Sequence, residues 1–364
     1  MKALVSFGLV IALLAAVTPT ATARKKPSRH HKTPAKKQTP APNEEATRLQ
    51  VFLDRANFSP GAINGTYDEF TLKALSLYRQ SRGESPPPPP AQPGGAPDIN
   101  GIDLASIGPV FIPYTVTDAD MRNVGALPND IAQQPKLKFL PYRDAAEAIA
   151  EKFHCDVHFL EQLNPGKTKT IKLGDQLKVP NVEPFDADAV KDLKPGSETA
   201  ANDISDENSG QFESPPPAPA DNGAQSPPPP PVNLKVDTKT NMVGVFQGDK
   251  IVAAYPITVG SGHTASPIGE WKVRGIAKLP RFRYDKEMLE RGKRSSNFQM
   301  LPPGPNSPVG VIWIALNKKG IGLHGTNEPE TIGRAVSHGC IRLANWDIVR
   351  LAQKVKAGVP VSIH

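Results

Sequence analysis

The chain is poor in cysteine, because its 364 residues contain only Cys155 and Cys340. Exported proteins that rely on disulfides usually hold several cysteines at short spacings, whereas these two lie 185 residues apart. One bridge between them is an alternative, but the sequence does not describe a disulfide scaffold. Each cysteine therefore has to be explained by packing or by chemistry.

Long apolar runs are absent except near the N-terminus. Lys2 precedes an apolar run from Val5 to Val17, and the small-residue sequence Ala21-Thr22-Ala23 follows it. The run is too short to span a bilayer, and its layout is typical of a cleaved secretory signal over residues 1–23. An uncleaved anchor is the alternative. We expect an exported protein of the periplasm or cell wall, with no membrane span after signal cleavage.

An excess of one charge is found only in one short segment. Residues 24–43 hold seven Lys or Arg and no acid, while the rest of the chain holds 36 basic and 36 acidic residues. This balance argues against a nucleic-acid partner. The basic segment is either a solvated linker or a site of attraction to anionic envelope polymers or lipid head groups.

Proline, in contrast, is abundant, with 40 residues. Polyproline spacers are extended and cannot pack a core, and here they stand at 86–90, 215–217 and 227–231. Residues 183–225 are acidic and poor in large apolar side chains, which predicts disorder. We expect small domains separated by a Pro-rich and irregular linker and by an acidic, Pro-rich linker. The linkers are 83–136 and 183–231, and the domains are 44–82, 137–182 and 232–364.

The first folded part, residues 44–82, is predicted to be two helices joined by a loop. Leu49, Phe52 and Leu53 share one helical face, and Leu72, Leu75 and Tyr78 share another. The segment resembles the small helical peptidoglycan-binding module, in which a turn like Ile63-Asn64-Gly65 separates two helices. It departs from that pattern at Asp68, where a second glycine is common. A helical hairpin without a ligand is the alternative.

The second part, residues 137–182, is predicted to be strand, helix, helix, strand. The first strand is KFLPY, the helices begin at Asp144 and Asp156, and the last strand follows Gly174. This βααβ pattern resembles a LysM module, which implies binding to the glycan strands of peptidoglycan. Cys155 lies between the helices, where a buried apolar role fits it.

The third part, residues 232–364, is dominated by strand patterns. Two extended runs flank the turn at Gly248-Asp249, and further strands follow up to IGLHGT. One late helix begins near Asn345, which can cap it, and a last strand ends the chain. We expect a mostly β domain with one late helix.

The segment SHGCIRL, residues 337–343, carries the chemistry of this domain. A thiol with its ordinary pKa of about 8.5 is mostly protonated at neutral pH, but an imidazole can take its proton and hold the ion pair. His338 and His324 are both candidates for Cys340, and Gly339 allows a tight turn whose N–H groups point at an oxyanion. A zinc site of His324, His338 and Cys340 is the alternative.

The stretch HGTNEPETIGRAVSHGCIRLANWDI, residues 324–348, resembles the signature of the L,D-transpeptidase (YkuD-type) catalytic domain, as do SPIGEWKV and PPGPNSPVGVIWIAL upstream. The resemblance implies a β-sandwich-like fold without a cofactor. It assigns Cys340 as nucleophile, His324 as general base, and the Gly325 carbonyl as the group that orients the imidazole. It also implies a supporting role for His338 and places Arg342 at the substrate site, where Ser337 shapes the turn.

The implied reaction is acyl transfer on peptidoglycan stem peptides through a thioester. D-Alanine leaves a tetrapeptide, and the acceptor is a neighbouring stem, a lysine of a wall-anchored lipoprotein, a free D-amino acid, or water in an L,D-carboxypeptidase. A non-catalytic wall-binding protein and a zinc hydrolase are the other hypotheses. The basic insertion over residues 278–294 is either a solvated loop or a lid. The oligomeric state is left open.

Overall fold

The protein is described by a computed structural model over residues 43–193, 231–260, 265–333 and 339–364. The expected signal at 1–23 and most of the acidic linker lie outside these residues. Within the described ranges, no helix is long and apolar enough to cross a membrane. All of them belong to one compact unit, Ala41–His364. The parts expected as small domains therefore pack together in the described part of the chain.

The two helices expected near the start are confirmed. They are α1, Glu44–Arg55, and α2, Glu69–Ser81, and their buried faces include Leu49 and Leu75. Asp68, which departs from the resemblance, is the N-cap of α2, and its side chain accepts a hydrogen bond from the Thr71 N–H. The carboxylate of Asp68 therefore has a structural role, which is to cap α2.

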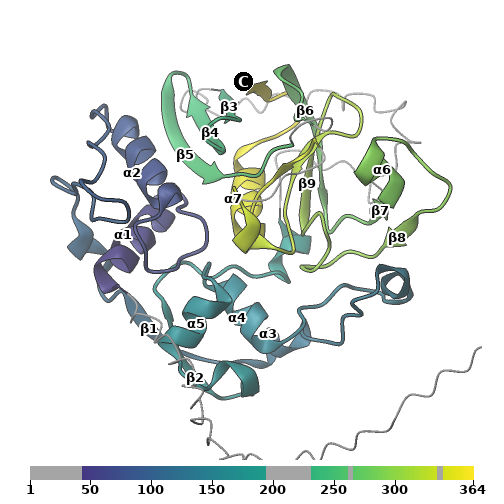
Figure 1. The fold of residues 1–364 in the computed structure, drawn as a ribbon, viewed down its shortest axis with the longest axis horizontal. Helices are drawn as coiled ribbons and strands as arrows, with labels where there is room; N and C mark the ends of the chain where they lie inside the picture. Colours follow the sequence, from purple (N-terminus) through teal and green to yellow (C-terminus); the bar gives the residue numbers. More distant parts are fainter. Residues whose placement is uncertain (1–42, 194–230, 261–264, 334–338) are drawn as a thin grey trace, which may run out of the picture. The chain divides into compact units, whose positions relative to one another are not determined.

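The next part contains a strand, two helices and a strand, but the first strand is not the expected one. Strand β1, Phe111–Thr115, pairs antiparallel with β2, Gln176–Pro180, and helices α4, Ala145–Lys152, and α5, Val157–Leu163, lie between them in sequence. Figure 1 shows the pair beside α5, with β1 to its left and β2 below it.

The strand expected at residues 138–142 is absent for a clear reason. The Leu140 N–H donates to Pro303 O at 2.8 Å, and Leu140 O accepts from Asn306 N at 3.3 Å, so its backbone is bonded to a distant loop. Pro141 has no N–H to give to a ladder. Gly304 has φ 146°, and a Cβ there would overlap the Leu140 backbone, so the close approach requires glycine.

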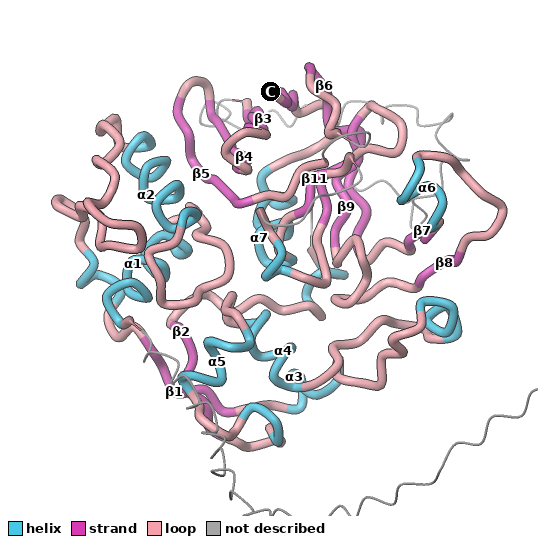
Figure 2. Tube along the Cα trace, viewed as in Figure 1, coloured by secondary structure: helices cyan, strands magenta, loops and turns pink. Residues whose placement is uncertain are grey.

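The segment expected as an irregular linker, 83–136, contains short elements. Besides β1 it holds α3 and two 3-10 helices, and two more 3-10 helices follow later. Their bounds are η1 Leu104–Ile107, α3 Asp118–Arg122, η2 Ile131–Lys136, η3 Thr168–Thr170 and η4 Ala189–Asp192. Figure 2 shows how much loop joins them.

The C-terminal part is mostly β, as expected. Its main sheet has the order β11-β10-β9-β6-β12-β3-β4-β5. The strands are β3 Val232–Asp237, β4 Met242–Gln247, β5 Lys250–Pro256, β6 Gly269–Lys278, β9 Ile312–Leu316, β10 Gly322–His324, β11 Ile341–Arg342 and β12 Pro360–Ile363. The turn predicted at Gly248-Asp249 joins β4 to β5.

Strand β6 connects the two halves of this sheet. Its first residues, 269–272, pair with β12, and its later residues, 273–278, pair with β9 across an irregularity at Val273/Gly275. Instead of the two separate sheets of a β-sandwich, the domain therefore has one continuous sheet, whose two halves share β6.

Helix α7, Asn345–Lys354, is the late helix that the sequence predicts, and Trp346, Ile348 and Leu351 bury its inner face. Asn345 does not cap it. The N-cap is Ala344, without a side-chain hydrogen bond, and the Asn345 amide turns into the interior. The capping prediction is wrong because buried backbone groups of other segments bind this amide.

The basic insertion is folded rather than a solvated loop. It contains β7, Phe282–Tyr284, and helix α6, Lys286–Arg291, and β7 pairs antiparallel with β8, Gln299–Leu301, which follows the insertion. Asp285, only 1% exposed, accepts from the N–H groups of Met288 and Ser295 and pairs with Arg283 at 2.7 Å. This one carboxylate holds the insertion together.

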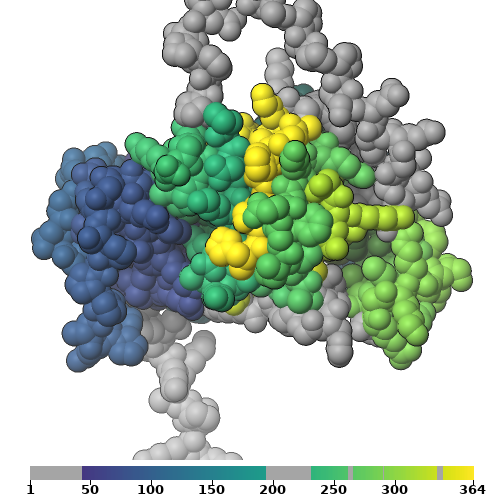
Figure 3. Space-filling model, turned by 90° about the horizontal axis from the view of Figure 1, so that it is seen from above, coloured from purple at the N-terminus to yellow at the C-terminus, as the bar shows by residue number. Residues whose placement is uncertain are grey.

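The upstream helices pack directly on the β-rich part. Asp54 of α1 pairs with Arg350 of α7 at 2.9 Å and with His154 at 3.0 Å, all in the interior. Phe58 forms a bridge with Ala254 of β5, and the apolar cluster of α1 and α2 includes Met242 and Ile251. In Figure 3 the purple and blue helices touch the green strands.

Candidate active site

Cys340 lies at the entrance to β11, one residue after Gly339. Gly339 has φ 104°, a conformation that favours glycine and turns the chain sharply before the cysteine. The thiol is partly exposed, donates to Gly320 O at 3.5 Å, and packs against the cluster of Val309 and Trp313. Its sulfur is thus held at a sheet edge, where a substrate can reach it.

His324 ends β10 and is fixed on several sides. In the sheet register it stands opposite Trp313 of β9 and Arg342 of β11. Its ring stacks on Trp313, with centroids 5.1 Å apart and planes 9° apart, and its Nδ1 lies 2.6 Å from Gly325 O. A carbonyl only accepts, so Nδ1 carries the proton and Nε2 of the neutral ring has the lone pair.

Cys340, His324 and Arg342 line the same cavity, whose volume is about 380 Å³. Three parts of the chain contribute to its walls. The insertion supplies Phe282, Arg283, Asp285, Met288, Leu289 and Arg294, the β-rich part supplies Pro308, Val309, Trp313, Gly320, Asn327 and Glu328, and η2 supplies Ile131. The upstream region therefore reaches the site.

Burial keeps both reactive side chains neutral. It lowers the pKa of His324 to about 3, an effect that Arg342 reinforces against the Gly325 hydrogen bond. It raises the pKa of Cys340 to about 11, although a backbone contact with Gly322 and the charge of Arg342 act in the opposite direction. Both shifts favour the neutral thiol and the neutral imidazole over an ion pair.

Three of the seven residues singled out from the sequence line the cavity, namely Cys340, His324 and Arg342. Gly325 and Gly339 are the chain neighbours of His324 and Cys340. Ser337 and His338 lie outside the described residues. Among the residues that are described, no group of three His, Cys, Asp or Glu side chains could hold a metal ion.

Cys155 lies elsewhere and has a different environment. It is 3% exposed, packs in the core of the middle part, and has its pKa raised by burial and by Asp156. This confirms the apolar role expected for it, because a buried thiol without a thiolate is inert. Both cysteines are free.

Sequence reasoning missed the residues that support the site. Trp313 and Asp285, which line the cavity, were not singled out, and Asn345, which contacts the backbone beside His324, was expected only as a helix cap. The alternation of VIWIAL places Trp313 on one face of a strand, and this signal could have pointed to it. Nothing local marks Asn345 or Asp285.

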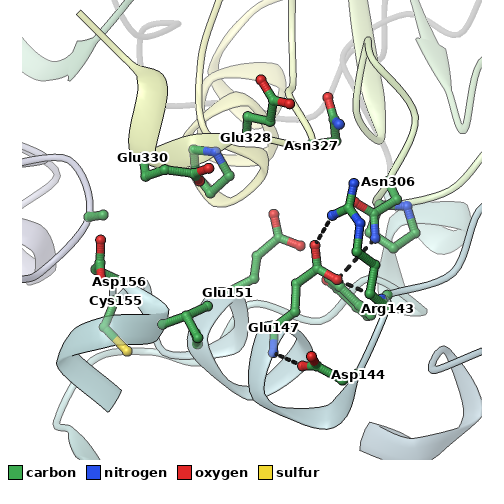
Figure 4. Close-up of a pocket in the computed structure, with 16 residues that line it drawn as sticks. Arg143, Asp144, Glu147, Glu151, Cys155, Asp156, Asn306, Asn327, Glu328 and Glu330 are labelled. Atoms are coloured by element: carbon green, nitrogen blue, oxygen red, sulfur yellow. Dashed lines mark hydrogen bonds and ion pairs between the residues drawn. The ribbon is translucent and has the colours of Figure 1, made fainter. Parts of the chain in front are cut away.

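A second cavity, of about 530 Å³, lies between α4 and the loop that follows β10, and Asn327 and Glu328 border both cavities. Figure 4 shows Glu147 and Glu151 rising from α4 toward Glu328 and Glu330. Glu147 accepts from Asn306 Nδ2 at 3.1 Å and pairs with Arg143 at 2.8 Å. The upstream part therefore forms one wall beside the Cys340 cavity.

A thiol and a neutral imidazole in one cavity are the elements of cysteine acyl transfer. Comparison with known proteins agrees with this class. The YkuD family, described as the L,D-transpeptidase catalytic domain, matches residues 231–363. The chain is 34% identical over 141 residues to the putative L,D-transpeptidase YkuD of Bacillus licheniformis, covering 39% of this chain and 70% of that protein.

Other relatives agree. The putative L,D-transpeptidase YqjB of Bacillus subtilis is 33% identical over 133 residues, which cover 35% of this chain and 68% of the relative. Solved structures similar to this chain include an L,D-transpeptidase from Mycobacterium smegmatis, with 20% identity and a TM-score of 0.30 over 36% of this chain and 58% of that one. Another is the catalytic domain from the E. faecium enzyme, with 20% identity and a TM-score of 0.30 over 36% of this chain and 96% of the other.

The chain therefore belongs to the L,D-transpeptidase family, whose members are cell-wall acyltransferases with a cysteine nucleophile. The family match covers residues 231–363, which include the main sheet and α7.

Proposed function

We propose that Cys340 is the nucleophile and His324 the general base of a two-step acyl transfer on peptidoglycan stem tetrapeptides. The observation that carries this proposal is the presence of the Cys340 thiol and the His324 ring in one cavity, with Nδ1 of the ring held by Gly325 O. A general base needs an available lone pair to take the thiol proton. Because the hydrogen bond to Gly325 O keeps the imidazole proton on Nδ1, the lone pair of His324 is at Nε2.

In the first step Nε2 of His324 takes the thiol proton as sulfur attacks the carbonyl of the diamino acid that precedes the terminal D-alanine. The carbonyl oxygen becomes an oxyanion, and the N–H groups of Gly339 and Cys340 are the candidate donors for it. The imidazolium then gives its proton to the departing amine of D-alanine, leaving a thioester on Cys340.

In the second step an amine attacks the thioester and restores the thiol. The acceptor is the side-chain amine of a neighbouring stem or a lysine of a wall-anchored lipoprotein, while water would give an L,D-carboxypeptidase. Arg342 lines the cavity, where its positive charge suits the carboxylates of the stem. The supporting roles of Ser337 and His338, which lie outside the described residues, stay predictions. Glu328, which interacts with Arg342, offers a charge for the incoming ammonium group.

The insertion acts as a lid in this proposal. Its helix and strands place Phe282, Arg283 and Met288 on the cavity wall, and Arg283 lies 4.0 Å from the centroid of the Phe298 ring. Closing the cavity over a bound stem would exclude water from the thioester and favour an amine.

The upstream part is proposed to hold the enzyme on its substrate in the periplasm or cell wall. The β1-α4-α5-β2 unit has the element order of a LysM module, and a groove of about 580 Å³ runs between β1, β2 and the end of α5. Phe111 and Leu163 give this groove apolar walls, and Asn164 and Lys178 give it polar groups suited to a glycan. The α1-α2 hairpin is the proposed peptidoglycan-binding module.

The test is to incubate the chain without residues 1–23 with disaccharide-tetrapeptide and to follow the products by mass spectrometry, beside Cys340→Ala. Loss of D-alanine together with dimers, both absent in the variant, supports cross-linking. Loss of D-alanine without dimers indicates a carboxypeptidase. No release of D-alanine from folded protein would contradict the proposal.

A further inference from the structure

The side chain of Asn345 joins three segments behind the catalytic cavity. It is fully buried. Its Oδ1 accepts from Val311 N at 3.1 Å, and its Nδ2 donates to Glu151 Oε1 at 2.8 Å and to Pro305 O at 3.3 Å. Such a buried amide is fixed in orientation when both its oxygen and its nitrogen are bonded.

The same amide is wedged between two glycines. A Cβ at Gly310 or at Gly325 would overlap Asn345 Oδ1, so the amide oxygen touches both backbones. Gly325 is the residue whose carbonyl oxygen lies 2.6 Å from His324 Nδ1. The position of the Asn345 amide therefore limits where the Gly325 peptide, and with it the hydrogen bond to the imidazole, can lie.

The strongest partner of the Asn345 nitrogen comes from outside the family's catalytic domain. Glu151 belongs to the last turn of α4, is 6% exposed, and also receives a hydrogen bond from Tyr142. Figure 4 shows its side chain directed from α4 toward the catalytic part. The hydrogen bonds from Tyr142 and Asn345 fix the position of the Glu151 carboxyl group. The fixed carboxyl group in turn restrains the Asn345 amide.

We propose that Glu151 is a positioning residue for catalysis, holding the Asn345 amide so that the Gly325 carbonyl keeps the His324 ring in its reactive orientation. The inference rests on the proposed function, since it assumes that His324 is the base. It makes the upstream part of the chain a component of the catalytic machinery as well as a wall-binding element.

Removing Glu151 would free the Asn345 nitrogen. The nitrogen would keep only the longer bond to Pro305 O and the oxygen its bond from Val311 N, so the amide would be held less firmly and the Gly325 peptide could shift with it. A displacement of about 1 Å at a reacting group can lower a rate by about 10²-fold. The loss should appear in kcat, because Glu151 does not line the cavity that holds the donor.

The experiment measures kcat and KM for D-alanine release from disaccharide-tetrapeptide by wild type, Glu151→Ala and Glu151→Gln, at a temperature well below each melting midpoint. We expect Glu151→Ala to lower kcat by about tenfold or more, with KM within about threefold. Glu151→Gln should stay within about threefold of wild type, because its side-chain oxygen still accepts from Asn345 Nδ2.

Glu147→Ala is the matched control. Glu147 lies one turn earlier on α4 and borders the same second cavity, but it bonds Asn306 and Arg143 instead of Asn345. A second readout is the Nδ1–H resonance of His324 in protein with ¹⁵N-labelled histidine. It should persist in Glu151→Gln and broaden or vanish in Glu151→Ala, which a merely structural role would not produce.

The proposal is overturned if Glu151→Ala keeps its kcat while only its melting temperature falls, if Glu147→Ala loses as much activity, or if glutamine does not restore it. Cys340→Ala and His324→Ala are run in the same assay. If they remain active, the proposed function itself fails. If they are inactive while Glu151→Ala is fully active, only the positioning role fails.

Discussion

The ring of His324 lies flat on the indole of Trp313, with centroids 5.1 Å apart and an angle of 9° between the planes. The two residues are register partners on β9 and β10, so the sheet itself sets this stack. Together with the Nδ1 contact to Gly325 O, it leaves the imidazole little freedom to rotate.

Replacing Trp313 by alanine should therefore lower kcat by about tenfold, because the ring of His324 loses the surface that orients it. Trp313→Phe should retain most of the activity, since a flat ring remains. The assay is D-alanine release at saturating tetrapeptide. Trp271→Ala serves as the control, because Trp271 lies on β6 and does not line the cavity. Equal losses in the two alanine variants would contradict the stacking role.

The pH dependence of thiol alkylation should reveal the neutral resting pair. With the pKa of Cys340 raised to about 11 by burial, its thiolate fraction grows about tenfold per pH unit. The rate constant for iodoacetamide at Cys340 should rise in this way from pH 6 to pH 9, measured by peptide mass spectrometry in a Cys155→Ala background. A rate that is already constant near pH 6 would instead indicate an ion pair.

Loss of Asp285 should disorder the insertion and weaken donor binding. This carboxylate accepts from the N–H groups of Met288 and Ser295 and pairs with Arg283. We expect Asp285→Ala to raise KM for the tetrapeptide by about tenfold while changing kcat less. Asp249→Ala, in the exposed β4–β5 turn, should leave both constants unchanged. A fall in kcat at constant KM would show that the insertion does not bind the donor.

The buried ion pair between Asp54 and Arg350 should dominate the stability of the contact between α1 and α7. Arg350→Ala leaves the Asp54 carboxylate, which is 0% exposed, without its main partner. The expected loss in free energy of unfolding is about 3–5 kcal/mol, by urea denaturation. Arg48→Ala, which removes an exposed pair with Glu44, should cost less than about 1 kcal/mol. Similar losses for the two variants would contradict this ranking.

Burial of Glu151 should make the fold less stable at alkaline pH. Burial raises its pKa to about 8, above the ordinary value of 4.5, although hydrogen bonds from Tyr142 and Asn345 oppose the shift. The folded state therefore binds more protons than the unfolded state between pH 4.5 and 8, and stability falls as pH rises through that range. The slope from this group is at most about 1.4 kcal/mol per pH unit.

Thermal melts at pH 5.5 and pH 8 test this sign. Wild type should melt at a higher temperature at pH 5.5, and Glu151→Gln should show a smaller difference between the two. Asp347, whose pKa burial also raises to about 8, keeps part of the dependence in that variant. A Glu151→Gln protein with the full wild-type difference would contradict the assignment to Glu151.

Much of the fold and site could be predicted because the relevant signals are local. Strands such as β4 and β5 alternate around a Gly-Asp turn, and α7 has a helical apolar face, so periodicity identifies them. His324, Gly325 and Cys340 stand in one short motif whose residue types are those of thiol chemistry. Their neighbourhood in space follows from the parallel pairing of β10 and β11, which the structure shows.

The rest depends on contacts that no local pattern encodes. The strand that pairs with β2 is Phe111–Thr115, far upstream. The expected strand KFLPY does not pair with β2, because the Leu140 N–H donates to Pro303 O in a distant loop. Asn345 has the ideal chemistry of a helix cap, yet Glu151 and Val311 bind its amide instead. Tertiary partners overrode local preference in both places.

Strand β12 joins β3, β4 and β5 to the rest of the main sheet. Pro360–Ile363 lies between β3 and β6, near the middle of the sheet. The β3-β4-β5 part packs on α1 and α2, and the other part carries His324 on β10 and Cys340 directly before β11. Removing residues 360–363 would therefore separate the strands that carry the reactive side chains from the strands that bind the upstream helices.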